Sequence, residues 1–136
     1  YSQARRLDEI LSKRQIVADR YAKLFSGVEG VTTPDVAKET TLMSWFVYVI
    51  RFDPRIDRDA VMIWLNEQGV QCRPYFTPIH LQPFYRNEFG YREGDFPVTE
   101  KVASSTLALP FFNRISNEEM SYVQDRVKTA VERYGR

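Results

Sequence analysis

Residues 71–85 (QCRPYFTPIHLQPFY) hold most of the side chains in this sequence that could do chemistry. They include the only histidine, His80, and the only cysteine, Cys72, together with three of the seven prolines. Proline fixes φ and disfavours helix at the residue before it, so the segment is predicted to be a stiff loop from which helix is excluded. A rigid loop that presents Arg73, Tyr75 and His80 is typical of a binding site, although a loop held rigid only for packing fits the same pattern.

Each candidate side chain has a structural alternative beside the functional one. His80, between two aliphatic residues, is either a satisfied, partly buried side chain or a contact for a ligand. Arg73, at the end of an expected strand, either binds an anion or pairs with an acidic residue of this chain. Cys72 is best interpreted as a small core residue.

The residue counts argue against several catalytic classes. One histidine and one cysteine leave a zinc site short of ligands and allow no internal disulfide. A nucleophile–His–acid triad would have to use His80, yet no G-x-S-x-G motif is present and nothing places a thiolate beside the imidazole. The phosphate-binding G-x-x-x-x-G-K-[ST] and G-x-G-x-x-G motifs are also missing. We therefore expect no metal site and no complete catalytic set in this chain.

The composition predicts one folded domain over residues 1–136, because 43% of the residues are hydrophobic. The 19 basic and 18 acidic residues nearly balance, which argues against nucleic acid or an anionic membrane as a partner. An RNA-binding sheet would need a second aromatic strand, which the sequence lacks. A single cysteine, with no internal disulfide, fits a reducing, cytoplasmic setting. No signal peptide and no apolar run of about 20 residues is visible. The first residue is not methionine, which suggests a piece of a longer chain.

Hydrophobic periodicity predicts long helices near both ends of the chain. Residues 2–26 carry apolar side chains at helical spacing and are followed by Gly27 and Gly30, which end helices well. Ser116 and Glu119 match a capping box that opens the last helix.

The central part alternates strand and helix signals. Residues 45–52 are the strongest predicted strand, after a polar connection over 31–43. Asp57 is predicted to cap a helix that ends at Gly69, and residues 70–73 are predicted to form a short strand.

The proline-rich loop is expected to continue through Gly90 and Gly94. Asp95 is predicted to cap a short helix that starts at Pro97, and residues 106–109 are expected to be extended. This order of elements predicts an α+β fold, a small and mainly antiparallel sheet covered by helices.

Five pieces of the sequence, in order, resemble the C-terminal part of the DegT/StrS family of fold-type-I, pyridoxal-phosphate-dependent aminotransferases. They are residues 3–14 (QARRLDEILSKR), 44–50 (SWFVYVI), 69–85 (GVQCRPYFTPIHLQPFY), 94–100 (GDFPVTE) and 107–110 (LALP). The resemblance extends from about residue 2 to residue 133. It identifies the chain as the C-terminal small domain of such an enzyme, with the large catalytic domain absent.

The resemblance implies that the parent enzyme transfers an amino group, usually from glutamate, to a keto sugar linked to a nucleotide. The parent would use pyridoxal phosphate held as a Schiff base on a lysine. None of the lysines of this chain stands in the family's lysine motif, so the chain alone is expected to bind no cofactor and to be inactive. The parent is expected to be a homodimer. The alternative is a stand-alone, non-catalytic binding or interaction module.

The resemblance also assigns candidate substrate contacts in the intact enzyme. His80 matches the family's P-L-H position near the substrate, and Arg73 and Tyr75 on the same loop are further candidates. Two positions depart from the family pattern. Phe46 stands where many members have histidine, so a hydrogen bond or charge from that position is lost. Phe76 falls where the family's tyrosine aligns, within one residue.

Overall fold

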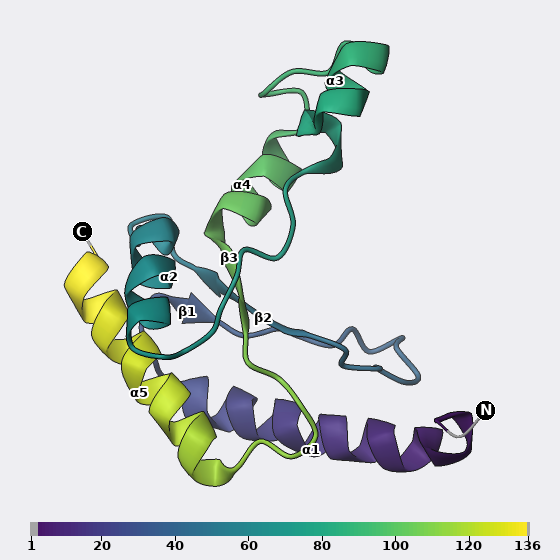
Figure 1. The fold of residues 1–136 in the computed structure, drawn as a ribbon, viewed down its shortest axis with the longest axis vertical. Coiled ribbons are helices and arrows are strands. Elements are labelled where there is room, and N and C mark those ends of the chain that lie inside the picture. Colours follow the sequence, from purple (N-terminus) through teal and green to yellow (C-terminus); the bar gives the residue numbers. More distant parts are fainter. Residues whose placement is uncertain (1–2, 136) are drawn as a thin grey trace.

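The computed structural model describes residues 3–135, which form a three-stranded sheet, five α-helices and two 3-10 helices (Figure 1). In chain order the elements are η1 (Ala4–Arg6), α1 (Leu7–Phe25), β1 (Val31–Thr32), β2 (Tyr48–Phe52), α2 (Arg58–Glu67), η2 (Ile79–Leu81), α3 (Pro83–Phe89), α4 (Pro97–Ser105), β3 (Thr106–Leu109) and α5 (Asn117–Tyr134). The long helices expected at both ends are confirmed.

The sheet is antiparallel throughout, with the strand order β1-β2-β3. Val31 lies opposite Phe52 at one edge, and Tyr48 lies opposite Leu109 at the other. Alternate residues of β2 are buried, as expected for a strand with one face on a core. The predicted α+β fold is therefore confirmed.

The core lies between this sheet and helices α1, α2 and α5 (Figure 1). The ring of Tyr21 from α1 lies 5.1 Å from that of Tyr48, centroid to centroid, and its hydroxyl donates to the Pro110 carbonyl at 2.8 Å. Leu65 of α2 and Val127 of α5 are fully buried. Each such apolar side chain contributes about 1.5–3 kcal/mol through burial.

Two predicted helix caps are present. The Asp57 carboxylate accepts hydrogen bonds from the backbone N–H groups of Asp59 and Ala60. Ser116 and Glu119 form the reciprocal capping box at the start of α5. These caps satisfy amide groups that a helix start leaves without intrahelical partners, so they fix where α2 and α5 begin.

The strands differ from the prediction at three places. The strand expected from residue 45 begins at Tyr48, because Trp45 adopts a positive φ of 46° that no regular strand contains. Residues 70–73 do not form a strand and make a single bridge between Arg73 and Ala108. The polar connection over 31–43 in turn contains β1, which is too short to give a sequence signal.

The exclusion of helix from residues 71–85 was wrong at the end of that segment. A 3-10 turn forms at residues 79–81, and α3 begins at Pro83. Proline is tolerated at the first helical position, where its missing N–H group has no intrahelical partner in any case. Gly90, at φ 72°, then ends α3 in the left-handed conformation.

The start of α4 at Pro97 is confirmed, but its predicted cap is not. Asp95 accepts instead from the Arg92 backbone N–H group at 2.8 Å. Glu100, in the first turn of the helix, accepts from the N–H groups of Gly94 and Phe96 and so ties the preceding loop to α4.

Elements η2, α3 and α4 extend away from the sheet and the three long helices (Figure 1). We call residues 75–105 the arm and the rest of the described chain the body. The arm leaves the body after the Arg73 bridge and returns as β3, so its two ends are fixed at neighbouring backbone positions.

Candidate functional site

His80 lies inside the arm rather than on its surface. Its side chain is 7% exposed, and Nε2 lies 2.8 Å from the Glu100 carboxylate. Its ring contacts that of Phe96 at 4.7 Å between centroids and meets the Tyr91 ring edge-on at 6.4 Å. The imidazole is therefore satisfied by one carboxylate and enclosed by aromatic rings.

Glu100 connects three parts of the arm. Besides His80 it accepts hydrogen bonds from the backbone N–H groups of Gly94, at 2.9 Å, and Phe96, at 3.3 Å. These N–H groups, the one of Gly94 first, together with His80 lower the pKa of the carboxyl below its ordinary value of 4.5. The carboxylate is consequently ionised at neutral pH and fastens η2, the 91–96 loop and α4 to one another.

A cavity of about 380 Å³ opens beside this pair, which we call the arm cavity. It is mostly apolar, with His80 as its one imidazole, and is lined by Ile79, His80, Tyr85, Phe89, Tyr91, Phe96 and Thr99. Such a cavity suits a flat or apolar group.

Arg73 and Tyr75 lie apart from His80. Arg73 is exposed at the base of the arm and lines a separate cavity of about 670 Å³ beside Cys72 and Pro74. Its guanidinium forms no ion pair with a residue of the described chain. Tyr75 is 37% exposed and packs its ring against Phe76. None of the cavities described for residues 3–135 is lined by more than one of the three predicted contacts.

Cys72 is a core residue, as predicted. It is 4% exposed, and burial raises the pKa of its thiol to about 11. The Asn66 side chain binds its backbone on both sides, through the Cys72 N–H group at 3.3 Å and carbonyl at 3.2 Å. A buried thiol with a raised pKa has little thiolate character, so it is unsuited to nucleophilic chemistry.

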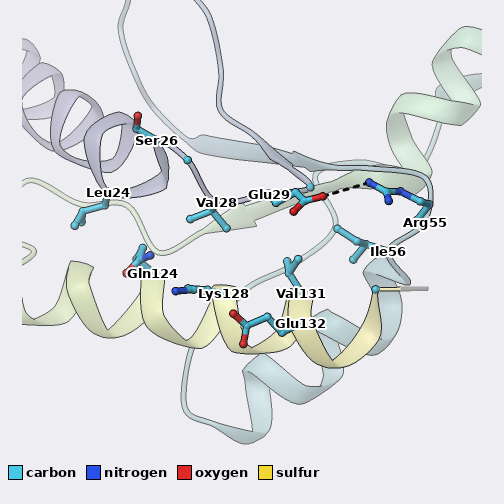
Figure 2. Close-up of a pocket in the computed structure, with 13 residues that line it drawn as sticks. Leu24, Ser26, Val28, Glu29, Arg55, Ile56, Gln124, Lys128, Val131 and Glu132 are labelled. Atoms are coloured by element: carbon cyan, nitrogen blue, oxygen red, sulfur yellow. Dashed lines mark ion pairs between the residues drawn. The ribbon is translucent and has the colours of Figure 1, made fainter.

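Another cavity, of about 550 Å³, lies at the far end of the body from the start of α1, between the 26–30 turn and α5 (Figure 2). Glu29 faces Arg55 across its rim at 4.0 Å, and Lys128 and Glu132 project from α5 on the other side. Its two basic groups are balanced by two acidic ones. This cavity therefore presents no charge that favours a particular ligand.

Within residues 3–135, no group of three or more His, Cys, Asp and Glu side chains is placed to hold a metal ion. None of the helices in that range has the length and apolar character needed to cross a membrane. All five lysines are exposed on the surface: Lys13, Lys23, Lys38, Lys101 and Lys128. A lysine that holds pyridoxal phosphate needs an enclosed cradle, so the lysines present here do not fit that group.

The aminotransferase family described as DegT/DnrJ/EryC1/StrS has a family model that matches residues 1–128. The chain belongs to this family. It is 30% identical over 133 residues to the spore coat polysaccharide biosynthesis protein SpsC of Bacillus subtilis. It is also 30% identical over 132 residues to a dTDP-4-dehydro-2,3,6-trideoxy-D-glucose 4-aminotransferase of Saccharopolyspora spinosa. These alignments cover 95% and 97% of the chain, but only 34% and 33% of the relatives.

Solved structures of the family share the fold. The aminotransferase TlmJ of Streptoalloteichus hindustanus superposes with a TM-score of 0.82 at 30% identity, over 97% of this chain and 34% of that one. The resemblance expected from the sequence is thus confirmed for family and fold. The chain spans about a third of the length of the curated relatives it matches.

Sequence reasoning missed two features. One is Glu100, the partner of His80, which lies 20 residues further along the chain on another helix. The sequence could have suggested this pair only if it had also predicted that α4 packs against η2. A second, arginine-containing cleft near Phe46 was also missed. It involves Arg14 and Arg114, which are 100 residues apart in the sequence.

Proposed function

We propose that this chain is the C-terminal small domain of a pyridoxal-phosphate-dependent sugar aminotransferase. The parent would transfer an amino group, with glutamate as the expected donor, to a keto sugar linked to a nucleotide. The observation that carries the proposal is the family match over residues 1–128, together with a 30% identical relative named as a dTDP-sugar aminotransferase. We further propose a cytoplasmic, homodimeric parent and an inactive isolated domain.

Pyridoxal phosphate would supply the electron sink for the amino transfer in the intact enzyme. The five exposed lysines of this chain offer no cradle for it. We therefore assign the Schiff-base lysine to a part of the parent outside these residues, and assign the chain a role at the substrate.

That role rests on His80, Arg73 and Tyr75. The Arg73 guanidinium is exposed and unpaired within the described chain, so it is free to bind an anionic group. His80 forms part of the wall of the arm cavity and is oriented by Glu100. Since these two sites are separate, we propose that Arg73 and Tyr75 contact the substrate directly and that His80 orients the arm toward it.

The test is amino transfer by the full-length protein, supplied with pyridoxal phosphate, glutamate and a dTDP-linked keto sugar. We expect formation of 2-oxoglutarate and a borohydride-reducible Schiff base, and neither with the 136-residue chain alone. A full-length protein that has no further catalytic domain, or that forms no 2-oxoglutarate with dTDP-, UDP- or GDP-linked keto sugars, would favour the stand-alone binding module instead.

Arg73→Gln separates a substrate contact from a surface arginine. We expect it to raise KM for the sugar substrate about tenfold, since a charge-assisted hydrogen bond is lost. Arg20→Gln, at another exposed arginine without an ion pair in the described chain, serves as the matched control. If Arg73→Gln and Arg20→Gln have the same KM for the sugar substrate, Arg73 does not contact the substrate. An unchanged kcat/KM in His80→Ala would show that His80 has no role at the substrate. If His80→Ala and Glu100→Gln instead lower kcat/KM equally, the result would support a positioning role for His80.

A further inference from the structure

The backbone at the base of the arm is held from two sides. On one side, Arg73 donates its N–H group to the Ala108 carbonyl at 3.3 Å and accepts from the Ala108 N–H group at 2.8 Å. Successive residues of an extended chain direct these groups to opposite sides, so those of Cys72 point away from β3. The sheet has ended there, and no further strand within residues 3–135 lies beyond Arg73 to bind them.

The Asn66 side chain takes the place of that missing strand. Its Nδ2 donates to the Cys72 carbonyl at 3.2 Å, and its Oδ1 accepts from the Cys72 N–H group at 3.3 Å. Nδ2 also donates to the Met62 carbonyl at 2.8 Å, one turn earlier in α2. A primary amide carries two donors and an acceptor, so every function of this side chain is used. We call this set of contacts the Asn66 clamp.

The turn after α2 brings the two halves of the clamp together. Gly69 has a φ of 79°, a left-handed conformation that glycine adopts without steric cost. It donates to the Asn66 carbonyl at 3.0 Å, and Val70 donates to the Leu65 carbonyl at 2.9 Å. The chain therefore reverses at the end of α2 and passes beside β3 before it enters the arm (Figure 1).

Arg73 depends on the clamp because its side chain has no anchor of its own. The guanidinium is exposed and forms no ion pair with a described residue. Pro74 restricts Arg73 to an extended conformation. The direction of the side chain is consequently set by the backbone of Cys72 and Arg73. Asn66 and Arg73 line the same cavity, of about 670 Å³, so the clamp lies directly beside the group that it fixes.

We propose that Asn66 is a positioning residue whose amide fixes the Cys72 backbone and thereby holds the Arg73 guanidinium in place for an anionic group of the substrate. The assignment rests on the proposed function, in which Arg73 contacts the substrate. Cys72 is 4% exposed, so without the amide its backbone groups lose their partners and must move to reach water. An arginine that moves with them binds an anion less tightly, because ordering it on binding costs free energy.

The test is a double-mutant cycle in the full-length protein, with the KM for the sugar substrate and kcat as readouts. Asn66→Ala is expected to raise KM about fivefold and to leave kcat nearly unchanged, since only binding is weakened. In the Arg73→Gln background the same change should add nothing, because the group that Asn66 positions is gone. An unchanged KM in Asn66→Ala, or an equal rise in both backgrounds, would overturn the assignment.

Tyr122→Phe is the matched control. The Tyr122 hydroxyl donates to the Gln68 carbonyl at 2.9 Å, so this variant also loses a hydrogen bond at the end of α2 but keeps the clamp. We expect a lower melting temperature in both variants and a raised KM only in Asn66→Ala. A raised KM in Tyr122→Phe as well would make Asn66 a general support of α2 and overturn its positioning role. If Asn66→Ala does not fold, the smaller change Asn66→Ser takes its place in the cycle, with the same criteria.

Hydrogen exchange at the Cys72 amide separates this inference from the proposed function. It reports the Asn66 contact in the full-length protein without any substrate, and it should accelerate about tenfold in Asn66→Ala but not in Tyr122→Phe. Unchanged exchange would overturn the clamp and leave the proposed function in place. Faster exchange in a full-length protein that performs no amino transfer would overturn the proposed function and, with it, the positioning role.

Discussion

The body and the arm are stabilised by different physics. The body buries a continuous set of apolar side chains between the sheet and three helices, with Tyr21, Ile50, Leu65 and Leu107 all fully buried. In the arm, His80 is the only buried residue of η2, α3 and α4, and its side chain is polar. Hydrophobic burial dominates the first region, and one polar network with stacked rings holds the second.

This difference indicates which region is suited to rearrange. A buried apolar core is cooperative, because each side chain depends on many neighbours. The arm exposes Phe84 by 63% and Phe89 by 60%, and its internal order depends on the single Glu100 carboxylate. The arm should therefore open at lower free energy than the body unfolds.

The strongest test of the body is Leu65→Ala. Leu65 is fully buried, so its truncation should lower the free energy of unfolding by about 3 kcal/mol, measured by urea denaturation. The same change at Leu42, which is 69% exposed, should cost less than about 0.5 kcal/mol. Similar losses in the two variants would contradict a core centred on α2, α5 and the sheet.

Cys72 lies where the body meets the arm and reports on that junction. At pH 8 the raised pKa of about 11 should slow labelling by a maleimide about a hundredfold relative to the urea-unfolded chain, because the thiolate fraction falls tenfold per pKa unit. Rapid labelling of the native chain would mean that the base of the arm opens readily.

The body is the region that sequence patterns predicted well. Apolar residues at helical spacing and local capping residues fixed α1, α2 and α5, because these signals act over a few residues. The errors arose where a tertiary contact overrode the conformation that the local sequence favours. The β-branched and aromatic run from residue 45 predicts a strand, but the Gln15 hydrogen bond and the buried indole hold Trp45 in another conformation.

The arm was predicted poorly for two reasons. The prolines of residues 71–85 predict a helix-free loop, although Pro83 stands at the start of α3 in the same way that Pro97 stands at the predicted start of α4. The pairing of His80 with Glu100 joins residues that only folding brings together. The same holds for the cleft beside Phe46, whose two arginines, Arg14 and Arg114, are 100 residues apart in the sequence. The sequence thus offers candidate residues in the loop, but it does not reveal that they lie at separate places in the fold.

The polar network of the arm can be tested by Glu100→Gln. Glutamine keeps one acceptor oxygen but places an NH2 group where the second carboxylate oxygen accepts from Gly94, and it removes the negative charge, so hydrogen exchange at Gly94 and Phe96 should accelerate about tenfold. Exchange in β2 should stay unchanged. Glu93→Gln, at an exposed residue of the same loop, is the control. Faster exchange in β2 as well would show that arm and body unfold as one unit.

The smallest expected effect is an acid titration of the arm, followed by NMR through the amide shift of Gly94. The pKa of Glu100 is lowered in the folded arm, so its stabilisation is complete above the ordinary glutamate range and is lost as the pH falls through the lowered value. We expect a midpoint below 4.5, absent in Glu100→Gln, while the amide shifts of β2 remain unchanged. A midpoint at or above 4.5 would contradict the hydrogen-bonded carboxylate. Protonation of the single Glu100 carboxylate weakens its contacts with His80, Gly94 and Phe96 together. The arm should therefore loosen over this narrow pH range while the apolar core of the body remains packed.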